Sequence, residues 1–187
     1  MAKRLDESIT LPLHDGALRI VVVADTHGRP HPKSAEVIAA QHPHHILHAG
    51  DIGDLQVLDR LAKIAPISAV RGNIDPHANG VPDTLTIDVC DGDERLFKML
   101  LLHSGVNGPK LRVDVVRLAH AEGARIVVCG HSHVPFIGRD RDLTIFNPGS
   151  IGPRRFQLPI VFGVIDISRQ RVAMQHVDCE SGQQWLP

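Results

Sequence analysis

Apolar residues along this chain fall into two kinds of run, which predict different elements. Residues 19–24 (RIVVVA) form an almost unbroken apolar, β-branched run, typical of a strand buried on both faces. Residues 55–63 instead place Leu55, Leu58 and Leu61 three apart, which is a helical spacing. By the same criteria we expect strands at residues 45–49 and 66–70 and another helix at residues 34–41. This β-α-β-α-β order indicates a largely parallel sheet.

The second half of the chain has a different pattern. Residues 84–90 alternate apolar and polar side chains, and the turn Asp-Gly-Asp leads into a return strand at residues 96–102. We also expect a helix at residues 111–121 and strands at residues 125–129, 143–146, 160–167 and 172–177. Both halves fit an α/β fold of four layers, α/β/β/α, with two mixed sheets flanked by helices. The turn His-Asp-Gly at residues 14–16 predicts an added strand within an N-terminal extension, residues 1–18.

Length and composition bound the class of protein. The 187 residues suit one domain, 1–187, at roughly 150 residues per domain. A net charge of −1 and 3% aromatic residues give little basis for binding nucleic acid. No apolar stretch approaches the roughly 18 residues of a membrane span, and the first eight residues lack the apolar core of a signal peptide. With three widely spaced cysteines and no CxxC pair, we expect a cytoplasmic protein with reduced thiols.

Residues that can bind metal ions follow the predicted strands, at the end where open α/β sheets bind ligands. Asp25 and His27 follow the first strand as D-x-H, and Asp51 follows the second. His131 and His133 follow a later strand as H-x-H. Residues two apart in an extended chain point to the same side, so each pair can reach one point. Carboxylate oxygens and imidazole nitrogens suit ions such as manganese, iron or zinc.

Each of these signals has an ordinary alternative when it is taken alone. Asp25 suits a helix N-cap, Asn73 suits a turn, and a strand-end histidine such as His103 is more often a surface residue. The Asn-Pro-Gly-Ser stretch at residues 147–150 alone is a tight turn. The combination is more specific, because six strand ends carry, in order, D-x-H, G-D, G-N, H, G-H-x-H and N-P-G-S.

This ordered set of motifs resembles that of the calcineurin-like metallophosphoesterases, over about residues 19–177. It is most similar to their small single-domain phosphodiesterase branch, which also contains the scaffold subunit of retromer. The resemblance implies a β-sandwich with two divalent metal ions at one edge. It implies that the first metal binds Asp25, His27, Asp51 and His133, and that the second binds Asp51 as a bridge with Asn73, His103 and His131. Beside these ligands it places Asp75, Asn147, Gly149, Ser150 and Arg154.

The resemblance also implies a function. A hydroxide held by the two metals would attack a small phosphoester, foremost a diester, with Asn73 orienting the phosphate. Manganese is the expected ion, and iron, zinc, cobalt or nickel are alternatives that these ligand types accept. The alternative function is a non-catalytic protein-interaction scaffold on the same fold. That alternative predicts degraded ligands, whereas all seven are present. The sequence leaves a homodimer open.

Two positions depart from the family pattern. Many relatives have a histidine directly after the Gly-Asn pair, where this chain has Ile74. Without that proton donor, we expect substrates with good leaving groups to be favoured. Relatives in this branch often read His-Gly-His where this chain reads His103, Ser104 and Gly105. The second departure affects an expected substrate contact and leaves the metal ligand in place.

Overall fold

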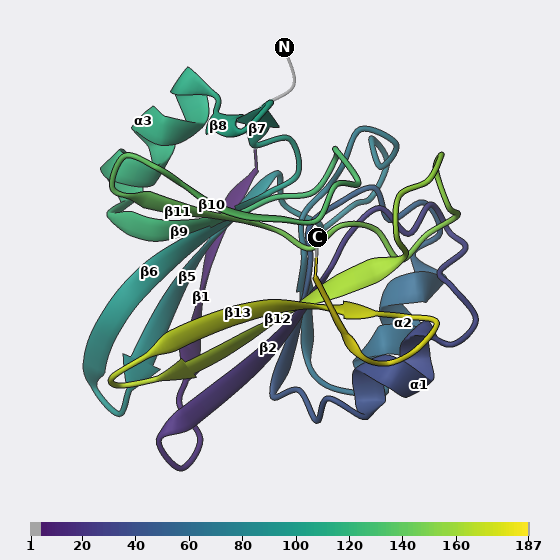
Figure 1. Ribbon diagram of the computed structural model, residues 1–187. Helices are drawn as coiled ribbons and strands as arrows, with labels where there is room; N and C mark the ends of the chain where they lie inside the picture. The colour runs from purple at the N-terminus through teal and green to yellow at the C-terminus, as the bar shows by residue number, and fades with distance from the viewer. Residues whose placement is uncertain (1–4, 187) are drawn as a thin grey trace.

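The computed structural model describes residues 5–186 and shows two six-stranded sheets packed face to face (Figure 1). Helix α3 (Val113–Glu122) covers the outside of one sheet. Helices α1 (Ser34–Ala39) and α2 (Gln56–Ala62) cover the outside of the other. Both sheets mix parallel and antiparallel pairs. The predicted four-layer sandwich of two mixed sheets is therefore confirmed.

The first sheet has the order β1-β5-β6-β9-β11-β10. Its strands are β1 (Asp6–Pro12), β5 (Thr84–Asp91), β6 (Glu94–Leu102), β9 (Ala124–Val128), β10 (Phe136–Asp140) and β11 (Leu143–Asn147). The predicted hairpin is the β5–β6 pair, which is antiparallel. Strands β6, β9 and β11 run parallel, so their carboxyl ends meet at one edge of the sheet.

The second sheet has the order β14-β13-β12-β2-β3-β4. Its strands are β2 (Ala17–Val23), β3 (His45–His48), β4 (Ile67–Ala69), β12 (Val161–Ser168), β13 (Val172–Asp178) and β14 (Gln184–Trp185). Strands β2, β3 and β4 are parallel, as the β-α-β-α-β pattern predicts. Their carboxyl ends carry the D-x-H, G-D and G-N motifs.

Successive residues of each central strand face opposite sides of the sheet, so each strand packs against both neighbouring layers. In β2, Ile20 and Val22 face the core between the sheets, whereas Val21 and Val23 face α1 and α2. In β6, Met99 faces that core and Leu100 faces α3. A strand with both faces buried needs apolar residues at consecutive positions, which accounts for the unbroken runs in the sequence.

The N-terminal strand was predicted, but its pairing is not the one that a hairpin turn would give. The turn at residues 14–16 carries the chain from one sheet to the other, and β1 pairs in parallel with β5 instead of lying beside β2. Residues 1–4 of the predicted extension lie outside the described residues.

Other differences concern short elements. Strands β10 and β14 were not predicted, nor was the hairpin of β7 (Val106–Asn107) and β8 (Lys110–Leu111). Because Leu111 belongs to β8, helix α3 begins two residues later than expected. Within residues 5–186, the structure contains no helix that is long and apolar enough to cross a membrane.

Candidate metal centre

The chain leaves its strand conformation abruptly at the residues of interest. Five of them have positive φ angles, which are uncommon outside glycine: Asp25 (54°), His27 (47°), Asp51 (54°), His131 (71°) and His133 (59°). Backbone hydrogen bonds join the first two loops, since the amides of Asp25 and His27 donate to the carbonyls of Gly50 and Asp51. Side chains from separate strand ends are thereby directed to a common point.

The first group of side chains gathers around the Nε2 atom of His133. This atom lies 3.3 Å from Nε2 of His27 and 3.3 Å from Oδ1 of Asp25. The Oδ2 atom of Asp51 lies 3.8 Å from Nε2 of His27. The structure thus brings together the four residues that the family resemblance assigns to a first metal.

The second group gathers around the Nε2 atom of His103. Oδ1 of Asp51 lies 3.2 Å from it and Nδ1 of His131 lies 3.3 Å from it. One oxygen of Asp51 therefore faces each group. That is the position from which a carboxylate can bridge two cations.

The separations and the burial both suit bound cations. Two ligand atoms about 2.1 Å from one ion, and 90–109° apart, lie about 3.0–3.4 Å from each other. Four of the distances above are 3.2–3.3 Å. Oδ1 of Asp25 is buried and accepts no hydrogen bond from residues 5–186, which is costly for a carboxylate. A cation would remove that cost, so the residues present fit divalent metal ions.

Burial opposes ionisation within the cluster. It raises the pKa of Asp25 to about 8, and the nearby Asp51 carboxylate raises it further. It lowers the pKa of His133 to about 4, with the Arg155 guanidinium as the next contribution. Burial also lowers the pKa of His27 and of His103. Because neutral imidazole is the form that coordinates metal, these histidines are suited to binding at neutral pH.

Two glycines allow the loops to approach this closely. A Cβ atom on Gly72 would lie 2.2 Å from Oδ1 of Asp51. A Cβ atom on Gly50 would lie 2.7 Å from Nδ1 of His103. The glycines of the G-D and G-N motifs are therefore required by packing against the candidate ligands.

Asp75 ties the second and third loops together. Its buried carboxylate accepts hydrogen bonds from the backbone amides of Ile52, Gly53 and Gly72, at 2.8–2.9 Å. It therefore lies beside the candidate ligands and fixes the backbone on both sides of Asp51.

The N-P-G-S segment supports two further loops. The Nδ2 atom of Asn147 donates to the carbonyl of Gly130 at 2.8 Å and thereby holds the loop of His131 and His133. The hydroxyl of Ser150 donates to the carbonyl of Asp25 at 3.1 Å. Gly149, between them, has a positive φ of 81°. Asn147 and Ser150 thus contact the backbone of the loops that carry the ligands, and Gly149 forms the turn between them.

The arginine of this region that contacts a candidate ligand is not the predicted one. Arg154 forms an ion pair with Glu180 at 2.6 Å and donates to the carbonyl of Leu158. Instead, Nη2 of Arg155 lies 3.2 Å from Nε2 of His27. Nothing in the sequence motif distinguished Arg154 from Arg155. The ion pair with Glu180 distinguishes them in the folded protein.

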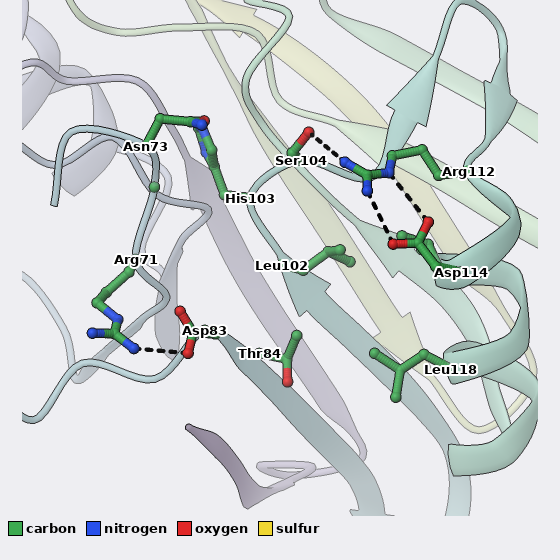
Figure 2. Close-up of a pocket in the computed structure, with 12 residues that line it drawn as sticks. Arg71, Asn73, Asp83, Thr84, Leu102, His103, Ser104, Arg112, Asp114 and Leu118 are labelled. Carbon is green, nitrogen blue, oxygen red and sulfur yellow. Dashed lines mark hydrogen bonds and ion pairs between the residues drawn. The ribbon is translucent and has the colours of Figure 1, made fainter. Parts of the chain in front are cut away.

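Asn73, the remaining predicted ligand, lies exposed at the edge of the cluster and lines a cavity of about 250 Å³ together with His103 (Figure 2). Figure 2 shows its side chain directed toward the His103 ring. Farther along the same cavity lie Arg71 and Arg112, which are paired with Asp83 and Asp114 at 2.7 Å and 3.0 Å. A polar cavity thus opens directly beside the second group.

The family departure at Gly105 follows from packing. Gly105 is buried, and a Cβ atom there would lie 2.8 Å from Cβ of Cys129. A histidine at this position would collide with Cys129 unless the backbone moved. Ser104 lines the cavity instead.

Comparison with known families agrees with the motifs and the fold. The family model described as the calcineurin-like phosphoesterase superfamily domain matches residues 18–170, most of the chain. The chain belongs to the calcineurin-like phosphoesterase superfamily. This family membership accounts for the order of the motifs along the strands, and Asp25, Asp51 and the histidines near them lie within the matched region.

Two archaeal relatives match over shorter stretches. Probable metallophosphoesterases of Methanocaldococcus jannaschii and Methanothermobacter thermautotrophicus are each 34% identical over 56% of this chain. The chain covers 52% and 59% of the lengths of these two relatives.

Solved structures show the same fold. Vacuolar protein sorting 29 of Cryptosporidium parvum superposes with a TM-score of 0.73, at 18% identity, over 91% of this chain and 95% of its own. An archaeal phosphodiesterase superposes with a TM-score of 0.63, at 18% identity, over 86% of this chain and 100% of its own.

Proposed function

We propose that this protein is a metal-dependent phosphodiesterase that acts on small phosphoesters. The observation that carries the proposal is the convergence of Asp25, Asp51 and four histidines from separate strand ends at ligand-like distances. Family membership supports hydrolysis of a phosphoester as the reaction class. The choice of a diester rests on the residues around the cluster.

These side chains would hold two divalent ions, for which manganese is our first choice. His27, His133 and Asp25 would hold one, and His103, His131 and Asn73 the other, with Asp51 between them. Divalent ions in such a site activate water and neutralise the phosphoryl oxygens. Two carboxylates leave the pair of cations with net positive charge, which favours an anionic phosphoester.

Asn73 and Ile74 would lie next to the organic groups of a bound phosphoester. Asn73 would offer its carbonyl oxygen to a cation and its NH₂ group to a phosphoryl oxygen. Ile74 follows it with a side chain that is 45% exposed and has no proton to give to a leaving group. Such a site turns over aryl esters, whose leaving groups need no protonation, better than alkyl monoesters.

The cavity beside Asn73 supports a substrate larger than phosphate. It is lined by Arg71, Ser104 and Arg112 and by the apolar Leu118 (Figure 2). Each guanidinium is paired with a carboxylate, so the cavity carries little net charge. A neutral, polar ester arm fits this lining better than a second phosphate does.

Metal analysis combined with a paired substrate assay tests the function. Bis(4-nitrophenyl) phosphate and 4-nitrophenyl phosphate share a leaving group and differ as diester and monoester. We expect two metal ions per chain and a kcat/KM about ten-fold or more higher for the diester. A monoester preference would contradict the diesterase assignment. A metal-loaded protein that hydrolyses neither ester would favour the scaffold alternative.

A further inference from the structure

The loop of residues 153–158 extends beside the first group of candidate ligands. Arg154 anchors it, through its ion pair with Glu180 and its hydrogen bond to the carbonyl of Leu158. The amide of Leu158 donates back to the carbonyl of Arg155 at 3.1 Å and closes a turn. The three residues between these anchors, Arg155, Phe156 and Gln157, are exposed.

Arg155 brings a positive charge to the edge of the cluster. Its Nη2 atom lies 3.2 Å from Nε2 of His27, and no carboxylate of residues 5–186 lies within ion-pair distance of it. The neighbouring Arg154, in contrast, is neutralised by Glu180. With a cation on His27, the guanidinium would be free to bind phosphoryl oxygens in a bidentate manner.

Phe156 is an exception among the aromatic residues of this chain. Its side chain is 93% exposed, whereas Phe146 and Phe162 are completely buried and the other three aromatic residues are half-buried. Its φ angle is 52°, a left-handed conformation that is unfavourable for a bulky residue. The fold therefore holds a phenyl ring in water directly after Arg155 in the chain, at a cost in both solvation and backbone strain.

We propose that Arg155 and Phe156 form a substrate-recognition pair, in which the guanidinium binds the phosphoryl group and the phenyl ring stacks on an aromatic group of the ester. The substrate class that follows is a phosphoester that bears an aromatic ring close to the phosphate. An exposed phenyl ring can bind an aromatic face without selecting one heterocycle, because every such ring offers a π face. This inference rests on the proposed function, since it takes the cluster as the place where phosphate binds.

Calorimetric titration with two phosphate probes tests the pair without requiring turnover. Adenosine 5′-monophosphate and ribose 5-phosphate share the sugar phosphate and differ by the adenine ring. With Mn²⁺ present, we expect the wild-type protein to bind the adenosine compound about five-fold or more tightly than the sugar phosphate. Phe156→Ala should abolish this difference, and Phe156→Trp should keep it.

Substitutions at Arg155 should change the binding affinities in a different way from those at Phe156. Arg155→Gln should weaken both probes alike, by about five-fold, and Arg155→Lys should recover part of the loss. Arg117→Gln, at an exposed arginine of α3, is the matched control and should change neither affinity. The two residues thus act on different parts of the same ligand, and a merely structural role would not separate them in this way.

Defined outcomes overturn the inference. Equal wild-type affinities for the two probes, absence of binding by both, or an unchanged ratio in Phe156→Ala would each contradict it. The esterase assay keeps this result apart from the proposed function. A protein that hydrolyses diesters with no effect of Phe156 retains the function and loses the inference. A protein that discriminates the probes through Phe156 but hydrolyses no ester retains the recognition pair alone.

Discussion

Oδ1 of Asp51 lies 3.2 Å from Nε2 of His103 in the buried interior of the cluster. The other ring nitrogen, Nδ1, lies 2.8 Å from the carbonyl of Ala49 and must be the donor in that bond. Burial lowers the pKa of His103, which favours the neutral ring, whose Nε2 lone pair then faces the carboxylate. A cation between two such acceptors would stabilise both of them.

Replacement of Asp51 by Asn should therefore remove metal and leave the fold intact. An amide NH₂ can donate to Nε2 of His103, so the pair is satisfied without a cation. We expect metal content, measured by elemental analysis, to fall from two ions per chain to one or none, and diesterase activity to fall about 100-fold or more. Asp59→Asn, at an exposed residue of α2, is the matched control. Two ions retained in Asp51→Asn would refute its bridging position.

Gly72→Ala tests the close packing behind that carboxylate. The new Cβ atom would lie 2.0 Å from the Asp51 amide nitrogen and 2.2 Å from Oδ1, so Asp51 must move. We expect a weaker metal affinity, measured by titration against a chelator, together with a loss of activity. Gly80→Ala is the control, because no atom lies within 4 Å of its Cβ position. Its positive φ should cost about 1 kcal/mol of stability and leave metal affinity unchanged.

Ile74→His tests the missing proton donor. The side chain of Ile74 is exposed next to Asn73, and its backbone amide donates to Oδ1 of Asp51 at 3.2 Å. A histidine there could protonate an alkoxide as it leaves. We expect kcat for methyl 4-nitrophenyl phosphate to change little and kcat for alkyl phosphomonoesters to rise about ten-fold or more. Val113→His, at another exposed position, should leave both unchanged. An equal effect on both substrates would argue against proton donation.

His48 gives the fold a pH-dependent contribution. Burial lowers its pKa to about 4, and Nδ1 accepts from the Gly50 amide while Nε2 bonds to the Thr26 hydroxyl. The unfolded chain binds a proton near pH 6.5 and the folded chain does not. Stability is therefore complete above pH 6.5 and falls as the pH drops toward 4, by about 3 kcal/mol at most.

Comparison of melting temperatures isolates this effect from other titrating groups. His48→Gln should be less stable than wild type at pH 7.5, and the difference should shrink by several degrees at pH 5. His77→Gln, at an exposed histidine, serves as control. A difference that stays constant or grows on acidification would contradict the assigned direction.

The sequence predicted the strands that are buried on both faces, because runs of consecutive β-branched apolar residues are typical of such strands. It also predicted that Asp25, Asp51 and the histidines would converge, since parallel strands end at a shared edge. It did not predict β10, because none of its residues is fully buried and its sequence, Phe-Ile-Gly-Arg-Asp, does not alternate apolar and polar side chains. Nor could it distinguish Arg155 from Arg154, because the contact with Glu180 spans 26 residues.

The left-handed turns at five candidate ligands were also beyond reach of the sequence. Glycine indicates such a conformation, whereas Asp25, Asp51 and His133 do not. The neighbouring loops impose it through backbone hydrogen bonds formed only in the folded protein. The N-terminal strand illustrates the same limit. The local pattern of residues predicted that a strand forms there, but only the tertiary pairing with β5 determines its position in the sheet.

The positive φ angles at five candidate ligands also change which substitutions the fold tolerates best at those positions. At such positions glycine is the least strained residue, so replacing a ligand by glycine relieves torsional strain while deleting its chemistry. Variants with a ligand replaced by glycine should consequently have a melting temperature at least as high as that of the metal-free wild-type protein in the presence of a chelator. Screening for thermal robustness alone would thus select inactive molecules, and any engineering of this scaffold has to select for turnover at the same time.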